Sequence, residues 1–297
     1  MGVSVVVPTV DRVELLDRCL AALEAQTVPA DEVLVVHDGD PDVEKLLLGW
    51  QDRLPLRCLE IKERGASAKR NAGWRAAQHH LVAFTDDDCA PMPGWVEALS
   101  VATGDLLAGP VSAHPDDSQT ASVFGRTIEI EEPGPYFPAA NIAITRTLLA
   151  RVGGFDPELA AGEDTDLAWR VREAGGSVEW VQQAHVHHAV RPRTFPEHLR
   201  SLWRWRDLAL VVRRHPELRA TLPAKVFWKA SHPEALLALI GVVGATRKPV
   251  LGLLAAPLLI HRWSQRGLRF GTQVAVADVA EVGVVLAGSV KHRSVLL

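Results

Sequence analysis

The first third of this chain alternates short apolar runs with amphipathic helical segments, and this rhythm limits the folds open to it. Runs rich in β-branched residues indicate buried strands, and apolar residues at helical spacing between them indicate helices. Because parallel strands need crossover helices, the pattern predicts an α/β fold with a mostly parallel, Rossmann-like sheet and helices on both faces. The predicted strands are Val3–Val7, Glu32–Val36, Leu56–Ile61 and Leu81–Thr85, and the predicted helices run from a capping box at Asp11 and Glu14 to Gln26 and over Ser67–His79.

The pattern loosens in the middle of the chain and then returns. Prolines, glycines and an acidic run at Glu129–Glu132 predict a loop-rich stretch over residues 108–138. We expect a catalytic domain at residues 1–193 and a helical region at residues 194–297, because 297 residues with 47% hydrophobic content are long for one domain. Later predicted strands are Ala140–Ile144, Ser177–Val181 and Ala184–His188, with helices from Thr145 to Val152 and from Glu163 to Ala174.

Charge divides the chain in the same way. Residues 1–195 hold 30 Asp and Glu against 17 Lys and Arg, whereas residues 196–297 hold 6 against 15. An acidic domain holds a nucleoside diphosphate only with a divalent cation or local basic residues, so we expect such a cation and no nucleic-acid partner. The basic C-terminal region suits an anionic surface.

The C-terminal region contains two apolar segments, Ala235–Ala245 and Val250–Ile260. Each is shorter than the ~20 residues of a membrane-spanning helix, and Thr246–Pro249 interrupts them, which predicts a hairpin that is either buried or dips into a membrane. One hypothesis is peripheral attachment to the inner face of the plasma membrane, and the other is packing on the core or on a second subunit as a homodimer. The tryptophans expected near a membrane interface are Trp203, Trp205, Trp228 and Trp263.

Cysteine usage and the N-terminal residues predict a cytoplasmic protein. The three cysteines, Cys19, Cys58 and Cys89, form no CxxC pair, so we expect a reducing compartment. The run MGVSVVVPT has no basic segment and no long apolar segment, and we interpret it as a strand rather than a signal peptide.

Three aspartates, Asp86–Asp88, follow the predicted strand Leu81–Thr85. In parallel sheets ligands bind beyond the carboxyl ends of strands, which is also where Asp38 lies. Crowded carboxylates there suit Mg²⁺ or Mn²⁺, which can bridge a diphosphate. The sequence therefore predicts a metal site at this edge.

Other polar clusters fall at element ends in the same domain. Lys69, Arg70 and Asn71 lie near a helix start, where cationic side chains can hold phosphate oxygens. Glu163, Asp164 and Asp166 open a helix after a glycine-rich stretch, where a carboxylate can deprotonate an acceptor hydroxyl. Histidines 185, 187 and 188 share one predicted strand, so neighbouring side chains alternate faces and one of them, His188 in our assignment, can complete a metal shell with Asp88.

Together these stretches resemble family 2 glycosyltransferases of the GT-A fold over roughly residues 3–192. The matching stretches are SVVVPTVDR at Ser4–Arg12, VVHDGD, RNAG at Arg70–Gly73, FTDDDCAP at Phe84–Pro91, FPAANIAITR at Phe137–Arg146, and GGFDPELAAGEDTDLAWR. The resemblance implies an inverting, metal-dependent transfer of a sugar from a nucleoside-diphosphate sugar to an acceptor hydroxyl on a glycan, lipid or small molecule.

The resemblance also implies roles for individual residues. The metal motif falls on Asp86 and Asp88 with Asp87 between them, and the Glu163–Asp164 pair supplies Asp164 as the catalytic base. The residues expected in donor binding are Pro8, Thr9 and Asp11 beside the nucleoside, Asp38 at the base, Arg70 and Asn71 near the phosphates, Asp86 and Asp87 of the metal motif, and Asn141 at the border of donor sugar and acceptor.

The sequence departs from the family at two places. His37 stands where relatives carry the first aspartate of a pair, which affects base or ribose recognition, and LWRWRD at residues 202–207 lacks the glutamine of processive synthases, which favours single-sugar transfer. Two alternatives are a sugar-1-phosphate nucleotidylyltransferase, which needs a glycine-rich loop after the first strand where this chain has PTVDRVELL, and a non-catalytic nucleotide-sugar binding protein.

Overall fold

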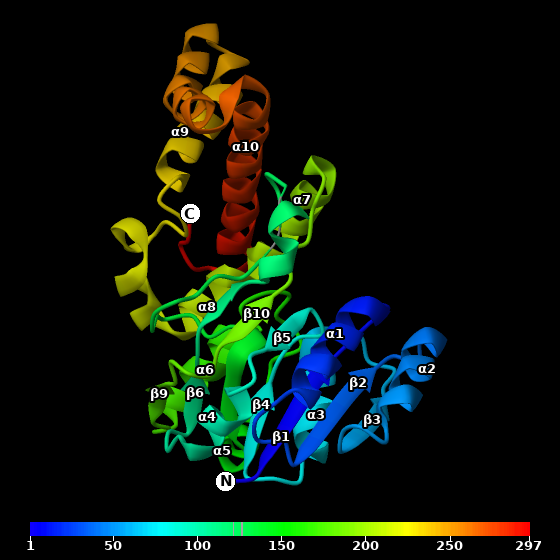
Figure 1. The fold of residues 1–297 in the computed structure, drawn as a ribbon. Helices are drawn as coiled ribbons and strands as arrows, with labels where there is room; N and C mark the ends of the chain where they lie inside the picture. The colour runs from blue at the N-terminus through cyan, green and yellow to red at the C-terminus, as the bar shows by residue number, and fades with distance from the viewer. Residues whose placement is uncertain (121, 126) are drawn as a thin grey trace. The chain divides into compact units, whose positions relative to one another are not determined.

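The computed structural model describes residues 1–120, 122–125 and 127–297. Two compact units are present, and Figure 1 traces the chain through both of them. Apart from residues 121 and 126, the first unit comprises Met1–Ala121, Gly125–Glu158 and Glu163–Arg191. The second unit comprises Ser122–Phe124, Leu159–Gly162 and Pro192–Leu297.

A seven-stranded sheet with the order β3-β2-β1-β4-β8-β6-β9 forms the centre of the first unit. The pairs β3–β2, β2–β1, β1–β4 and β6–β9 are parallel, whereas β8 runs antiparallel to β4 and β6. The predicted α/β fold with a mostly parallel sheet is confirmed. The strands are β1 Val3–Pro8, β2 Glu32–His37, β3 Leu56–Glu60, β4 Leu81–Phe84, β6 Leu106–Ala108, β8 Ile142–Thr145 and β9 Val178–Trp180.

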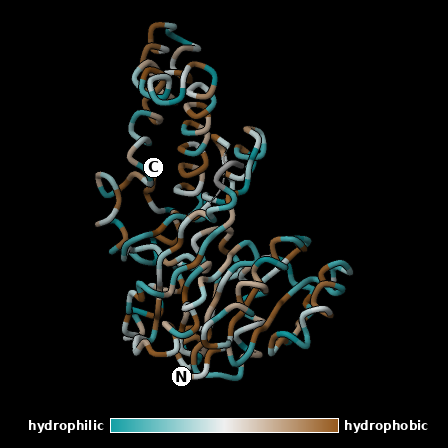
Figure 2. Tube along the Cα trace, in the orientation of Figure 1, coloured by the Kyte–Doolittle hydropathy of each residue, from teal (hydrophilic) through white to brown (hydrophobic). Residues whose placement is uncertain are grey.

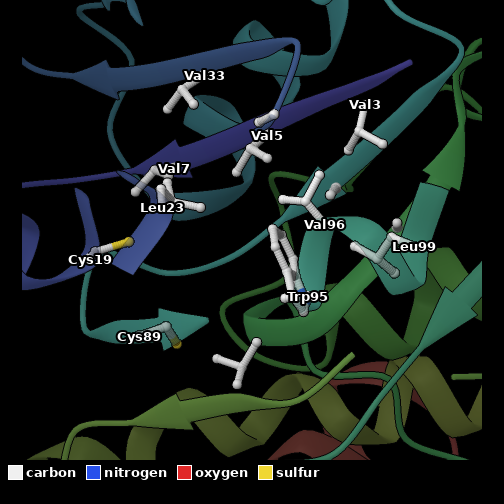
Figure 3. Close-up of a cluster of buried hydrophobic side chains, with 14 of the residues drawn as sticks. Val3, Val5, Val7, Cys19, Leu23, Val33, Cys89, Trp95, Val96 and Leu99 are labelled. Carbon is white, nitrogen blue, oxygen red and sulfur yellow. The ribbon is translucent and has the colours of Figure 1, made fainter. Parts of the chain in front are cut away.

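Helices cover both faces of this sheet, because successive strand residues point to opposite sides. Val3, Val5 and Val7 pack with α1, α2 and α4 in one buried cluster, part of which Figure 3 shows. Val6 and Val82 lie in the opposite cluster with α3, α5 and α6. The helices are α1 Val13–Glu24, α2 Pro41–Trp50, α3 Ala66–Ala76, α4 Trp95–Val101, α5 Arg146–Val152 and α6 Glu163–Glu173.

Gly73 sets how closely α3 approaches the sheet. A Cβ atom at this position would lie 2.3 Å from Cγ1 of Val6 and 3.3 Å from Cγ2 of Val36, so a larger residue would push the helix off β1 and β2. The glycine of the RNAG stretch thus places Lys69 and Arg70, one turn earlier, close to the carboxyl edge of the sheet.

A smaller sheet lies beside the main one in the same unit. Its order is β5-β10-β7, with β10 (Val186–His188) antiparallel to β5 (Cys89–Pro91) and parallel to β7 (Val111–Ala113). The register pairs His188 with Cys89. Segments about a hundred residues apart in sequence therefore meet directly after the three aspartates.

The structure corrects several local predictions. The capping box at Asp11 and Glu14 is wrong, because Arg12 occupies the N-cap position of α1 without a side-chain cap. No helix was predicted directly after His37, but α2 begins at Pro41, where Asp40 caps the backbone N–H groups of Asp42 and Val43. Short elements such as α4 and β7 were not predicted, because three to seven residues carry too little periodicity.

The stretch over residues 108–138 is largely irregular, as predicted. It includes residues 121 and 126, which lie outside the described residues. The described part holds the end of β6, all of β7, the 3₁₀ helix η1 (Pro115–Thr120) and an isolated antiparallel bridge between Val111 and Ile130, and η2 (Ala139–Asn141) follows it.

The second unit is helical. Two small apolar cores hold it together, one around Leu208, Val212 and Val285, and the other around Ala238 and Ala275. Its α-helices are α7 Phe195–Leu202, α8 Leu208–Arg214, α9 His232–Ala245 and α10 Ala256–His292, and its 3₁₀ helices are η3 Trp203–Asp207, η4 Pro216–Thr221, η5 Pro223–Lys225 and η6 Pro249–Ala255.

The second apolar segment of this unit is much longer than the eleven residues predicted. It continues beyond Ile260 as α10, with a non-helical residue at Gly267, and ends at His292. Within the described residues one helical stretch, Pro249–His292, is long and apolar enough to cross a membrane by length and composition alone.

Candidate active site

Three aspartates follow β4 at the carboxyl edge of the parallel sheet. Asp87 and Asp88 are buried, and Arg12 forms ion pairs with both: its Nη2 lies 2.5 Å from Asp87 Oδ1, and its Nη1 lies 2.7 Å from Asp88 Oδ2. Thr9 Oγ1 donates to Asp87 Oδ2 at 2.7 Å. Burial raises the pKa of Asp87 to about 7, against the opposing charge of Arg12.

A buried arginine joins this cluster to the start of α6. Arg70 Nη2 lies 2.6 Å from Asp86 Oδ1, and its Nη1 lies 3.1 Å from Glu163 Oε1. Burial alone would lower the pKa of Arg70, but the charges of Asp86 and Glu163 outweigh it and raise that pKa above its ordinary value. The guanidinium therefore stays charged and ties the two acidic clusters into one site.

Asp164 lies next to Glu163 in the first turn of α6. Its Oδ1 accepts from the backbone N–H of Thr165 at 2.7 Å, and its Oδ2 accepts from that of Ala139 at 3.2 Å. Burial and the adjacent charge of Glu163 raise the pKa of Asp164 to about 6, although Arg70 acts in the opposite direction. A carboxylate with this pKa is a stronger base than an ordinary aspartate and is still mostly ionised at neutral pH.

His188 on β10 faces the last of the three aspartates. Its Nδ1 lies 2.8 Å from the carbonyl oxygen of Ala189, and its Nε2 lies 3.5 Å from Asp88 Oδ1. Because Nδ1 must carry a proton to donate to a carbonyl, the neutral ring presents an unprotonated Nε2 toward a carboxylate. Two acceptors facing each other in a buried place suit a cation between them.

Asp88, Cys89 and His188 form the one group within the described ranges whose ligand atoms all lie within 4.8 Å of one another. Burial raises the pKa of the Cys89 thiol well above its ordinary value. A thiol that keeps its proton is a poor metal ligand, so the oxygen and nitrogen atoms of the group are the stronger donors.

The predicted nucleoside-side residues gather at the ends of β1 and β2. Pro8 ends β1 and Thr9 follows it, both buried, whereas Asp11 is exposed. Lys69 is buried, donates from Nζ to the carbonyl of Thr9 at 2.6 Å, and lies 3.3 Å from Asp38 Oδ2. The Asp38 side chain is one-third exposed at 33%.

The side-chain amides of Asn71 and Asn141, both predicted to bind the donor, form hydrogen bonds with protein groups. Asn71 Oδ1 accepts from Phe155 N and Trp74 Nε1, and its Nδ2 donates to Phe155 O. Asn141 Oδ1 accepts from Trp95 Nε1, and its Nδ2 donates to the carbonyls of Pro110 and Ala184. In this structure both side chains hold neighbouring loops in place.

Sequence reasoning gave no role to three residues that shape this site: Arg12, Trp95 and Arg191. Arg12 neutralises two of the aspartates, and Arg191 Nη1 lies 3.8 Å from Asp88 Oδ2. Trp95 is fully buried and holds Asn141. The signal for Arg12 was its position just after the first strand, four residues from Pro8, at the same sheet edge as the aspartates.

Comparison with known proteins identifies the family. The profile described as "Glycosyl transferase family 2" matches residues 4–144, a range that contains the three aspartates, Arg12, Arg70 and Asn141. The chain is therefore similar to glycosyl transferase family 2 over nearly half of its length. It is 29% identical over 218 residues to glycosyltransferase AglE of Haloferax volcanii, an alignment that covers 68% of this chain and 71% of AglE.

A second relative is the pre-mycofactocin glycosyltransferase of Mycobacterium tuberculosis. The identity is 28% over 242 residues, covering 74% of this chain and 49% of that protein, so the chain spans about half of its length.

A solved structure shows the fold. The mannosyltransferase PcManGT from Pyrobaculum calidifontis, in complex with GDP-Man and Mn²⁺, aligns with a TM-score of 0.60 at 20% identity, covering 98% of this chain and 86% of that one. The GT-A fold implied by the sequence resemblance is thus confirmed, and neither the nucleotidylyltransferase nor the binding-protein alternative is favoured.

Proposed function

We propose that this family 2 glycosyltransferase is metal-dependent and inverting, and moves a sugar from a nucleoside-diphosphate sugar to an acceptor hydroxyl. The observation that carries the proposal is the Arg70 bridge between Asp86 and Glu163, at 2.6 and 3.1 Å. It brings a cation-binding motif and a candidate base, which are far apart in sequence, to one edge of the sheet.

Asp86, Asp88 and His188 are the residues proposed to hold Mg²⁺ or Mn²⁺. The fit rests on the buried Asp88 carboxylate and on His188, whose Nε2 faces that carboxylate at 3.5 Å while its Nδ1 lies 2.8 Å from the carbonyl oxygen of Ala189. A divalent cation bound there supplies charge that stabilises a departing diphosphate. The PcManGT complex contains Mn²⁺, which supports the choice of metal.

The donor is proposed to lie along the ends of β1 and β2. Pro8, Thr9, Asp11 and Asp38 would contact the nucleoside. Arg70 has a buried Nε without a hydrogen-bond partner among the described residues, and this donor suits a phosphate oxygen. Asp87, Asn71 and Asn141 act in this proposal by holding the neighbouring donor-binding loops, because their side-chain atoms contact protein groups.

Asp164 is the proposed base, with Glu163 as its partner. Asp164 accepts the proton of the acceptor hydroxyl as that oxygen attacks the anomeric carbon, and the nucleoside diphosphate leaves from the opposite face, which inverts the configuration. Backbone N–H groups of Thr165 and Ala139 orient the carboxylate. Glu163 holds Arg70 and raises the pKa of Asp164 by its charge.

The biological setting is also a proposal. We propose a cytoplasmic enzyme that transfers one sugar at a time, with a glycan, lipid or small-molecule acceptor, and homodimer formation stays a prediction. The named relatives act on different substrates, so the base and sugar of the donor are left open here.

Thermal unfolding of the full chain with a panel of nucleoside-diphosphate sugars, with and without Mn²⁺, tests the proposal. Ligand at about 100 times its Kd stabilises a protein by about 2.7 kcal/mol, so one sugar nucleotide should raise the Tm by several degrees only when Mn²⁺ is present. Pyrophosphate release from a sugar phosphate and a nucleoside triphosphate would instead support a nucleotidylyltransferase, and binding without any transfer or donor hydrolysis would support a binding protein.

A further inference from the structure

The second unit contains a hairpin in which the usual burial of side chains is reversed. We call residues 235–277, from α9 through η6 to the middle of α10, the apolar hairpin. Figure 2 shows apolar residues along both of its arms. Most of the buried positions are small: Ala235, Ala238 and Ala275 are at most 3% exposed and Gly241 is buried, and Leu258 is the large side chain buried among them.

The large aliphatic side chains of the apolar hairpin point outward instead. Leu253 is 71% exposed, Leu268 is 70% exposed and Val243 is 63% exposed, and Leu237, Ile240, Val242, Val250 and Ile260 are exposed as well. In water the hydrophobic effect favours the reverse arrangement, with large side chains inside. Helices in lipid pack through small residues and present large apolar side chains outward.

Close packing of the two arms depends on glycine. A Cβ atom on Gly241 would lie 2.8 Å from the carbonyl oxygen of Leu251, and one on Gly244 would lie 2.7 Å from the Leu251 side chain. The inner seam of the hairpin is therefore tightly packed, and the outer face does not have to fold inward to complete a core.

Basic residues dominate the charge of the apolar hairpin. Residues 235–277 contain no Asp or Glu and five basic residues, Arg247, Lys248, Arg262, Arg266 and Arg269, while Asp278 and Glu234 just outside this range pair with Arg262 and His261. Arg247 and Lys248 are exposed at the turn between α9 and η6. An exposed apolar face with cations at its turn and flank complements an anionic lipid surface.

We infer that the apolar hairpin inserts into the surface of an anionic bilayer and anchors the chain as a peripheral membrane protein. A second copy of the chain fits this face less well, because two such turns would bring the exposed Arg247 and Lys248 of both copies together. The inference does not depend on the proposed transfer reaction.

The remainder of α10 stays outside the bilayer in this account, so the long helix does not span it. Glu281 is buried and forms an ion pair with Lys229 at 2.6 Å. Lys291 and His292 pair with the buried Asp207 at 3.1 and 3.0 Å. These polar contacts tie the last turns of α10 to η3 and the rest of the helical unit.

The tryptophans expected at a membrane interface are thereby reassigned in part. The rings of Trp205 and Trp228 lie 6.4 Å apart and pack against the buried core around Leu208. Trp263 lies on the apolar hairpin, where its Nε1 donates to Thr272 Oγ1. Of these three, only Trp263 is assigned to the interface.

Co-sedimentation of the full chain with vesicles tests the inference. The vesicles contain phosphatidylcholine alone, or phosphatidylcholine with about three parts in ten of phosphatidylglycerol. The wild-type chain should bind the anionic vesicles and lose most of this binding in high salt. Leu253→Asp should weaken binding at least about tenfold, and the double variant Arg247→Glu with Lys248→Glu should weaken it about tenfold or more.

Val101→Asp is the matched control, because Val101 is 73% exposed on α4 of the first unit. It should bind as the wild type does, and the Tm of every variant should stay near the wild-type value because the altered side chains are exposed. Equal binding by Leu253→Asp and the wild type would overturn the inference, as would no binding to anionic vesicles at low salt.

A second measurement separates lipid from a second copy. A polarity-sensitive dye on Leu253→Cys, in a Cys58→Ser background, should shift to the blue on adding anionic vesicles, whereas the same dye on Val290→Cys should not. A dimer in light scattering that Leu253→Asp dissociates, together with no blue shift on vesicles, would assign the face to a second copy instead.

Discussion

The carboxyl edge of the parallel sheet and the apolar hairpin depart from ordinary burial in opposite directions. At the sheet edge, charged side chains such as Lys69, Arg70 and Asp87 are buried, and protein partners of opposite charge hold most of them. On the hairpin, large aliphatic side chains such as Leu253 face outward. Each arrangement is costly in water without a partner. The charges at the sheet edge are thus offset within the chain, whereas the large side chains on the outer face of the hairpin stay exposed.

The two regions also differ in how they tolerate change. Single substitutions at the sheet edge should alter chemistry and metal binding by large factors, whereas substitutions on the exposed hairpin face should leave the fold and the sheet edge unchanged. Variants at the sheet edge test the first of these two expectations.

Asp164→Asn should give the largest effect. Loss of the base should lower kcat by about 10² to 10⁴, because an amide cannot accept the acceptor proton. Asp116→Asn, which alters an 86% exposed carboxylate, is the control and should keep wild-type turnover. Steady-state kinetics measures both, and undiminished turnover in Asp164→Asn would remove this residue from the role.

His188→Gln should weaken Mn²⁺ binding by about 10- to 100-fold, which is the usual cost of disturbing a metal shell. His187→Gln is the matched control, because His187 points to the other side of β10, where its ring lies 5.6 Å from that of His114. Calorimetric titration with Mn²⁺ gives the affinities without any substrate. An equal loss in both variants would contradict ligation by His188.

The pH profile should show the raised pKa of Asp164. The base must be ionised, so kcat/KM should be level above pH ~6 and fall about tenfold per pH unit below it. Since the folded-state pKa of about 6 lies above the ordinary value of 3.8, the ionised group costs stability at neutral pH, and this cost declines as the pH falls below 6 and disappears below the ordinary value. A decrease in kcat/KM that begins only near pH 4 would contradict the raised pKa of Asp164.

Arg12→Gln should have a smaller effect, on stability. Removing the guanidinium leaves Asp87 and Asp88 crowded and should lower the stability of the metal-free protein by about 2 kcal/mol, since Arg12 is only partly exposed. Adding Mn²⁺ should raise the Tm of this variant by more than it raises the Tm of the wild type. Arg18→Gln, which breaks the ion pair with Asp117, is the control that Mn²⁺ should not restore.

The sequence predicted the parts of this molecule that depend on local pattern. The four parallel strands β1 to β4 follow from apolar runs, and the position of Asp86–Asp88 follows from the end of β4. The sequence predicted a strand over Ala184–His188 and placed His188 with Asp88, but it did not predict that β10 pairs with β5, because the three residues of β5 carry no periodicity. It also did not predict the ion pairs of Arg12, which form across 75 or more residues.

The hairpin shows a different limit of prediction. Its segments are apolar on all sides, so composition predicted a hairpin but not which side chains face outward. Only the packing of Gly241 against Leu251 fixes the inner seam. The length of α10 was underestimated, because the prediction covered only the apolar run Val250–Ile260 and the helix continues through the charged residues that follow it.

A crystal structure of the chain with Mn²⁺ and a nucleoside diphosphate tests the central claim most directly. We predict an anomalous manganese peak within coordinating distance of Asp88 and His188, with the diphosphate bound to the ion beside Arg70. A manganese ion and diphosphate bound elsewhere, with the three aspartates still paired to Arg12 and Arg70, would contradict the account.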